Sequence, residues 1–398
     1  MSDASPPATP SAMDRLRASL FDIRVIRVLI QIIFLLGVLV GGAALISNTQ
    51  RGLARLGLVP SFGFLNAPSN VPISEGPIPH TAADTFGHAF VVGIVNTLRA
   101  VVVGLIGTTI LGLIVGVARL SSNWLTRTLS LIFIEIMQNT PLLLQLIFLY
   151  AGVFLALPPA RESIQLPGPS YLSVRGLATP ALIPTTNITL WTVIVLGAVI
   201  LGVTLYRRLR KQGLESGART YAFEIGLLIP VITLLVATAL FAPYTVSYPE
   251  IIGPRYAPGA GSVVSPEYVA IVVGLILYTG AYTAEVVRSG IQSVSQGQWE
   301  AARSQGFSYF QTLRLIILPQ ALRVMIPPLT NQYLNLIKNS SLAGVVGFAD
   351  VFGVGKTALE SGQTVPVVII VMLIYLVMDL TTAFVMNILN QRVQIKAR

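Results

Sequence analysis

The sequence predicts an all-helical integral membrane protein with about eight membrane-spanning helices. The 398-residue chain is 54% hydrophobic and only 11% charged, its mean hydropathy is +0.76, and apolar runs of about 20 residues recur along it. A helix of about 20 residues rises far enough to cross a hydrocarbon core of about 30 Å. This composition excludes the two or three water-soluble domains that the length alone would allow.

Eight spans follow from these runs, with polar residues inside the second, third and seventh. The first has a basic approach like a signal peptide, but its length favours a retained membrane helix. The spans are expected at 28–46, 90–117, 129–157, 190–206, 225–242, 268–287, 325–348 and 365–389. The chain then divides into an N-terminal tail (1–27), an extra span and outer loop (28–85), a first core part (86–158), an insertion with two further spans (159–266), a second core part (267–392) and a C-terminus (393–398).

Basic residues orient the spans, because Lys and Arg accumulate in short cytoplasmic loops. With both termini inside, 18 of the 26 Lys and Arg residues fall on the cytoplasmic side, six fall outside and two lie at membrane depth. The formal charge of +10 is spread over these inner loops without a basic stripe. We therefore expect no nucleic-acid partner. The excess positive charge can contact anionic membrane lipid instead.

Residue types exclude several chemistries. The chain has no cysteine, which removes disulfides and thiolate sites, and only two histidines, His80 and His88. We expect these to be hydrogen-bonding surface residues with no carboxylate at helical ligand spacing, and hence no metal site. No Ser/His/Asp or paired-carboxylate arrangement indicates an enzyme, so we predict no catalytic residues.

Long outer connections are rich in Pro and Gly, at 51–85, 157–188 and 243–266. These connections are longer than the loops that usually join two helices. Two interpretations remain open, a compact outer cap and merely solvated connections.

The cytoplasmic connection 288–323 has helical signals of its own. Ser295 with Gln298, and Ser308 with Gln311, have the spacing of capping boxes. They predict a helix from about 296 that stops at Gly306, and a second helix that runs to Pro319.

Two interpretations fit the surface of this bent pair. Ala301 and Ala302 form a small, flat surface suited to docking on another protein, whereas Phe310, Leu313 and Ile317 on one side of the second helix suit a helix lying on the membrane.

Residues 300–319, EAARSQGFSYFQTLRLIILP, also resemble a known family. Their spacing reproduces the EAA pattern of membrane subunits of bacterial ABC importers. In that family the bent loop is a coupling helix seated in a groove of a separate ATP-binding subunit. The resemblance thus assigns coupling to Glu300, Ala301, Ala302, Gly306, Ile316, Leu318 and Pro319.

A second resemblance narrows the family. The segment FIEIMQNTPLLLQLIFLY (133–150) is similar to the E-x-x-R-x-T-P-L-L-x-Q signature of polar amino-acid permeases. Gln138 replaces the usual Arg, so Glu135 needs another partner. Segments 96–123 and 331–351 resemble the same permeases, and insertions like 160–265 occur in their general L-amino acid, or glutamate/glutamine/aspartate/asparagine, branch.

The resemblance implies a type I ABC importer permease core in the bacterial inner membrane, importing polar L-amino acids from periplasm to cytoplasm. It also implies three partners: an ATP-binding subunit dimer, a second permease subunit that is identical or related, and a periplasmic amino-acid-binding protein. ATP and Mg would belong to the partner subunit, and this chain would hold no cofactor. The sequence GVGKT at 353–357 is not a P-loop, because Asp350 stands where such a loop needs Gly.

Polar groups at membrane depth are the candidates for a substrate pathway, because such groups usually face a path or a partner. Lys338, hydroxyls and amides offer donors and acceptors to a free amino acid, and polar contacts between helices are the alternative. The pathway candidates are Gln138, Asn139, Thr140, Asn331, Gln332, Lys338, Asn339, Ser340 and Ser341. The other intramembrane charges are Arg99, Glu135, Glu285 and Asp379, of which Glu285 and Asp379 are expected near the inner ends of their spans, in structural pairs or exposed at the interface.

Two other functions remain open. A permease of the same class for an opine or osmolyte would keep the coupling loop and differ along the pathway. An ion-driven secondary transporter would need no ATPase, and the match at 300–319 would be accidental.

Overall fold

The computed structural model describes residues 23–55, 61–217, 220–360 and 362–393. Seven of its helices are long and apolar enough to cross a membrane, or eight if one bent pair counts as a span. The all-helical membrane architecture expected from the sequence is confirmed. Most of the tail 1–27 and of the terminus 393–398, with Arg219, lies outside the described residues.

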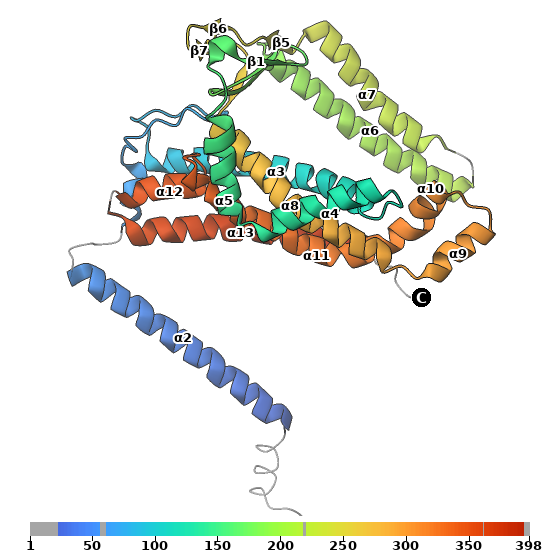
Figure 1. Cartoon of the computed structure of the whole chain (residues 1–398), viewed down its shortest axis with the longest axis horizontal. Coiled ribbons are helices and arrows are strands. Elements are labelled where there is room, and N and C mark those ends of the chain that lie inside the picture. Colours follow the sequence, from blue (N-terminus) through green and yellow to red (C-terminus); the bar gives the residue numbers. More distant parts are fainter. Residues whose placement is uncertain (1–22, 56–60, 218–219, 361, 394–398) are drawn as a thin grey trace, which may run out of the picture.

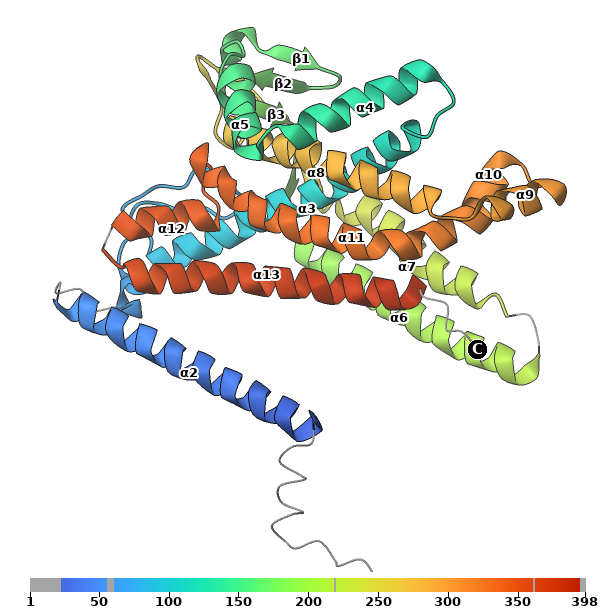
Figure 2. The same cartoon turned by 60° about the horizontal axis from the view of Figure 1, so that its bottom comes forward.

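The core is built on α3 (Phe86–Ala118) and α8 (Pro266–Gln292), which pack along most of their length (Figures 1 and 2). Glycines on α3 make this approach possible. A Cβ on Gly112 would lie 2.3 Å from Thr283 Cγ2, and one on Gly116 would lie 2.6 Å from the Ala284 carbonyl oxygen. Small residues at such contacts let helix backbones approach closely in a membrane.

Three further helices complete this bundle. Helix α11 (Leu318–Asn339) packs on α8 and on α13 (Thr364–Val393). The short 3₁₀ segment η5 (Ser340–Val345) leads from α11 toward α12 (Val351–Glu360), which packs on α3 and α13. The central apolar cluster includes Leu146, Ile271, Leu275, Leu336 and Phe348, all almost fully buried.

The third predicted span is broken rather than straight. Helix α4 (Trp124–Asn139) and the segment α5 (Leu142–Ile147) with η2 (Phe148–Phe154) meet at an angle of 104°. Pro141 lies in the gap and has no N–H to continue the helix. The single span expected at 129–157 is therefore divided at this proline.

The seventh span corrects the prediction that a helix ends at Pro319. The helical segment Tyr309–Val345 is continuous, through α10 (Tyr309–Thr312), the π-helical turn η4 (Leu313–Ile317) and α11. The backbone N–H of Leu318 bonds to the carbonyl of Leu313, five residues back. Pro319 follows this wider turn and lies in the first turn of α11. The N–H that proline lacks is tolerated at this position.

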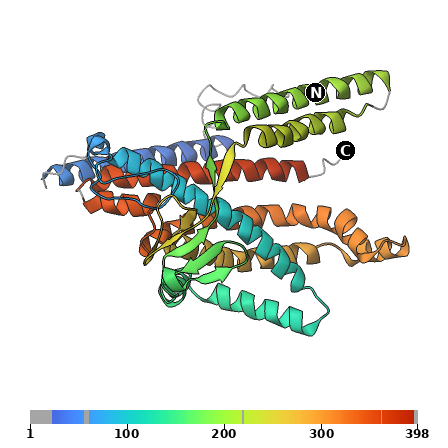
Figure 3. The ribbon, with the colours of Figure 1, turned by 90° about the horizontal axis from the view of Figure 1, so that it is seen from above.

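The remaining spans are peripheral. Helix α2 (Ile23–Arg55) lies apart from the core, with none of its apolar window buried (Figure 2). Helices α6 (Ile188–Ser216) and α7 (Ala222–Phe241) form the predicted hairpin, with a Cβ on Gly202 falling 2.5 Å from the Gly226 carbonyl oxygen. The loop end of this hairpin and helix α9 (Gln296–Ser304) lie toward the same end of the molecule (Figures 1 and 3).

The two loops that flank this hairpin form a compact cap, which decides between the two interpretations left open for them. Strands β1 (Ile164–Leu166), β2 (Ser170–Ser173), β3 (Gly176–Thr179) and β8 (Ser262–Val264) make an antiparallel sheet in the order β1-β2-β3-β8. Two smaller pairs add β4 (Ala181–Pro184) with β5 (Tyr244–Ser247), and β6 (Ile251–Ile252) with β7 (Arg255–Tyr256).

The α3–α8 contact generates a stability prediction. Gly116→Ala places a methyl group against the backbone of α8, so we expect it to destabilise the protein by about 1–3 kcal/mol, as overpacking does. Gly37→Ala in α2 is the matched control, because nothing lies within 4 Å of the added methyl. Thermal unfolding in detergent should show a lower transition for Gly116→Ala only, and equal transitions would contradict the packing argument.

Candidate functional site

The connection between α8 and α11 projects from the end of the bundle as two short helices, α9 and α10 (Figures 1 and 3). Helix α9 ends in a Schellman motif. The Phe307 N–H bonds to the Ala302 carbonyl, the Gly306 N–H bonds to the Arg303 carbonyl, and Gly306 has a φ of +79°. The predicted stop at Gly306 is confirmed.

The two predicted capping boxes differ. At α10 the Ser308 hydroxyl accepts from the Gln311 N–H, and the Gln311 side chain accepts from the Ser308 N–H. At α9 the Ser295 side chain makes no capping bond, so the prediction of a capping box there is wrong. Only the backbone carbonyl of Ser295 bonds to the Gln298 N–H.

The projection is fastened to the bundle by an apolar cluster. Ile291 of α8, Ile317 of η4 and Met325 of α11 are buried in it, and Trp299 of α9 packs against it. The Trp299 ring also stacks on Tyr309, with the ring centroids 5.8 Å apart. Gln320 Nε2 donates to Gln298 Oε1 at 3.3 Å, joining α11 directly to α9.

The surface of the projection differs from the predicted one. Ala302 is only 2% exposed and faces its own chain, so it cannot form part of a flat docking surface with Ala301. Glu300 and Ala301 are exposed, and the Glu300 side chain has no hydrogen bond or ion pair within the described part of the chain. Leu313 and Ile317 pack inward, whereas Phe310 is 68% exposed and does not share their surroundings.

The remaining positions of the motif lie at the base of the projection. Ile316 packs against the apolar cluster, Leu318 is half-buried and Pro319 is exposed.

The break between α4 and α5 is held by one buried amide. Gln145 Nε2 donates to the carbonyls of Met137 and Thr140, both at 2.9 Å. The Met137 carbonyl is the group that an N–H at position 141 would have bonded in a continuous helix. Gln145 belongs to the matched permease signature, but its role could not be deduced before the bend was known.

The candidates beside this break bond mainly within their own segment. Asn139 Nδ2 donates to Glu135 Oε2 at 2.9 Å, which supplies the partner that Glu135 lacks with Gln138 in place of Arg. Thr140 bonds to the Ile136 carbonyl. Gln138 alone reaches α8, where its Nε2 lies 3.4 Å from the Ala281 carbonyl.

The second polar group lies around the end of α11. Lys338 Nζ lies 3.6 Å from Asp379 Oδ2, although the Lys338 side chain is 61% exposed. Asp379 lies near the middle of α13, so its expected place at an inner end is wrong.

Hydroxyl groups near Lys338 bond locally, Ser340 to the Ile337 carbonyl and Ser341 to the Lys338 carbonyl. Asn331 is exposed, and Gln332 and Asn339 are half-buried. Among the described residues, no hydrogen bond joins this group to the one beside the α4–α5 break.

The other intramembrane charges are paired. Arg288 Nε donates to both carboxylate oxygens of Glu285 at 3.0 Å. Arg99 Nη1 lies 3.4 Å from Glu75 Oε1, and its guanidinium lies 4.9 Å from the centre of the Tyr268 ring. Glu75 was missed because it comes from the outer loop, which carries no hydropathy signal.

The two histidines also differ from expectation. His80 Nδ1 lies 3.0 Å from His88 Nδ1, so they are hydrogen-bonded, but His80 is buried. Asp84 is four residues from each of them and its carboxylate lies close to both rings. The expectation that no carboxylate lies at metal-ligand spacing from the two histidines is therefore wrong.

The amide at the break generates the second prediction. Gln145→Leu removes both donors and leaves two carbonyls without partners in an apolar environment, which costs about 1–3 kcal/mol for each group. Thermal unfolding in detergent should show a clear loss of stability. Gln50→Leu, at an exposed position of α2, should leave unfolding unchanged. A Gln145→Leu protein as stable as the parent would show that the break needs no such bonds.

Comparison with known proteins identifies a family model and relatives that match this chain. Residues 220–395 match the family model described as "Binding-protein-dependent transport system inner membrane component". The chain is 38% identical over 353 residues to the general L-amino acid transport system permease protein AapQ of Rhizobium johnstonii, covering 88% of each chain. It is 33% identical to the glutamate/glutamine/aspartate/asparagine transport system permease protein BztB of Rhodobacter capsulatus, covering 98% of each. A solved amino acid ABC transporter with histidines gives a TM-score of 0.46 at 21% identity, over 77% of this chain and 95% of that one.

Proposed function

Because this chain belongs to the family of binding-protein-dependent transport system inner membrane components, we propose that it is the permease subunit of an ATP-driven importer. Its cargo is polar L-amino acids, carried from periplasm to cytoplasm. The names of AapQ and BztB support the substrate class. The shape and anchoring of the α9–α10 projection carry the rest of the proposal.

The projection has the properties that coupling to a separate ATPase requires. Its bend is set by backbone bonds at Gly306, and its base is buried between α8 and α11. A force on the exposed residues Glu300 and Ala301 therefore reaches two core helices through packed side chains. An ATP-binding subunit dimer, which would carry ATP and Mg, is the partner that this surface fits.

Polar groups that are exposed at membrane depth support a second permease subunit. Glu135, Asn139, Asn331 and Lys338 are exposed in this chain although they lie on membrane-spanning elements. Such groups avoid lipid and face a protein partner or a water-filled path. A pathway between two permease subunits, fed by a periplasmic amino-acid-binding protein, meets this requirement.

Orientation follows from the same assignment. The projection contacts a cytoplasmic ATPase, so the outer loops and the strand cap face the periplasm and both termini lie inside.

Two experiments distinguish the proposed function from the alternatives. Competition with amino acids in uptake assays distinguishes an amino-acid permease from one for an opine or osmolyte. Copurification distinguishes an ABC importer from an ion-driven transporter, and we expect it to recover an ATP-binding subunit and a second permease.

The coupling assignment predicts a charge-reversal effect. Glu300→Lys should lower ATP-dependent uptake in reconstituted vesicles by roughly 5- to 150-fold, the range of typical coupling free energies, while membrane insertion stays normal. Lys211 is exposed near the end of α6, so Lys211→Glu is the control for a reversed charge outside the projection and should leave uptake unchanged. Unchanged uptake with Glu300→Lys would refute the coupling role.

The pathway assignment predicts a separable effect at Lys338. Lys338→Met alone leaves the carboxylate of Asp379 without its partner at membrane depth, so we expect a lower thermal unfolding transition. Lys338→Met combined with Asp379→Leu removes both charges and should restore stability, yet raise the KM for uptake because the substrate carboxylate has lost a cation. Wild-type uptake by the double variant would make the pair structural only.

A further inference from the structure

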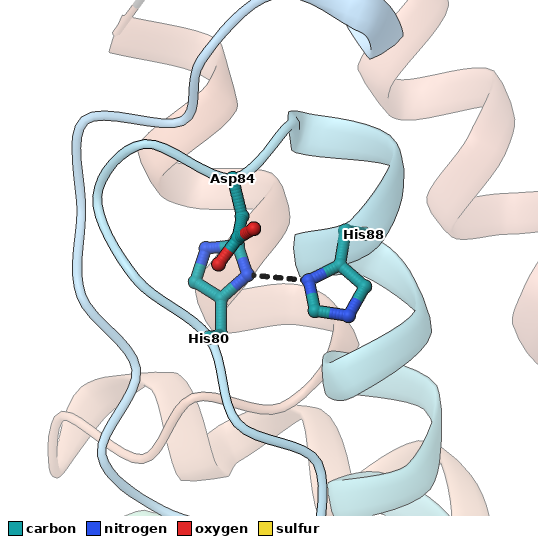
Figure 4. Close-up of side chains that lie close together, drawn as sticks. All are labelled: His80, Asp84 and His88. Carbon is teal, nitrogen blue, oxygen red and sulfur yellow. Dashed lines mark hydrogen bonds between the residues drawn. The ribbon is translucent and has the colours of Figure 1, made fainter.

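Both histidines of the chain and one carboxylate meet where the outer loop enters α3. His80 and Asp84 lie in the loop and His88 lies in the first turn of the helix (Figure 4). One ligand-type atom from each residue lies within 4.8 Å of the other two. Nothing in the coupling projection or the polar pathway groups uses these residues.

The fold holds each of the three in place independently. Thr85 caps α3 and accepts from the His88 N–H at 3.2 Å, which fixes His88 in the first turn. His80 pairs with Ile73 in an isolated bridge across the loop. The Thr81 N–H and hydroxyl both donate to Asp84 Oδ2, at 2.6 and 2.8 Å.

A second group fixes the tautomer of His80. The Ser69 hydroxyl lies 2.9 Å from His80 Nε2 and donates to the Val71 carbonyl at 3.3 Å. Since one hydroxyl has one proton, His80 Nε2–H donates to Ser69, and the lone pair of His80 Nδ1 points toward His88. Metal-binding histidines are held in this way by a bond to the second ring nitrogen.

The surroundings of two of these groups favour their deprotonated forms. Burial lowers the pKa of His80, and the bonds from the Thr81 N–H and hydroxyl lower the pKa of Asp84.

We propose that His80 Nδ1, His88 Nδ1 and the Asp84 carboxylate bind a divalent transition metal of the zinc type. Two imidazoles and one carboxylate suit zinc and its neighbours rather than calcium or magnesium, which take oxygen ligands. A tetrahedral site with bonds of about 2.0–2.1 Å sets its ligand atoms about 3.3 Å apart. The two Nδ1 atoms are 3.0 Å apart, and a carboxylate oxygen of Asp84 lies within 4.8 Å of a ligand atom of each histidine. Water fills the fourth position.

The bound metal ties the outer loop to the start of α3. The same loop carries Glu75, which bonds to Arg99 on α3 and, at 3.1 Å, to the Ser265 N–H that precedes α8. The loop thus contacts α3 near its middle and α8 at its outer end, and the metal adds a third attachment. Its removal should loosen the loop without unfolding the bundle.

The test is zinc binding by the full chain in detergent, purified with a tag free of histidine and treated with chelator. Titration calorimetry should find one zinc per chain, and cobalt(II) should give the visible absorption of a tetrahedral site. His88→Gln and Asp84→Asn should each weaken binding by roughly tenfold or more, and Ser69→Ala by about 10- to 100-fold through its bond to His80.

Glu162→Gln, an exposed carboxylate of the outer cap, is the matched control and should leave binding unchanged. Thermal unfolding without metal checks that each variant folds, and Asp84→Asn keeps an acceptor for Thr81 should His88→Gln not fold. Absence of stoichiometric binding, or equal binding by parent, His88→Gln and Asp84→Asn, would overturn the proposal. Because only the isolated chain and the metal are used, this result is independent of transport.

Discussion

Helices α3 and α8 approach so closely that a methyl group on Gly112 or Gly116 would overlap atoms of α8. Every functional element described above is attached to this pair. The α9–α10 projection continues from the end of α8, Gln138 beside the α4–α5 break bonds to the α8 backbone, and α11 packs on α8. The outer loop contacts α3 at Arg99 and the outer end of α8 at Ser265, both through Glu75. A displacement at one end of α8 is therefore carried to the break, to α11 and to the outer face.

The lack of water in the membrane explains the local features that surround this pair. A proline at position 141 frees a carbonyl that must find a donor, and the Gln145 amide supplies it. Pro319 is accommodated by the π-helical turn before it, and Arg99 is neutralised by a carboxylate from outside its span. At Gln145 and at Arg99 the bond is made to a group on a neighbouring segment. Lys338 is also paired across helices, with Asp379, yet its side chain stays 61% exposed.

Features that depend on local sequence were predictable, and features that depend on distant contacts were not. Hydropathy located the spans, and Gly306 located the end of α9. Burial of Ala302 depends on how α9 lies against the bundle, so a reading of the helix alone placed it wrongly on the surface. The strands of the cap are two to four residues long, no longer than the shortest run in which a period-two pattern can be recognised. Asp84 is four residues from each histidine, so its spacing alone could have identified it from the sequence.

Shape and surface are encoded separately in the α9–α10 projection. Its bend depends on two backbone hydrogen bonds and on the positive φ of Gly306, and its orientation depends on buried residues at its base. None of these involves the exposed side chains of Glu300, Ala301 or Arg303. Substitutions at those positions can change what the projection binds without changing where it points. Such a surface can diverge together with its partner, one side chain at a time, while the turn that supports it stays constant.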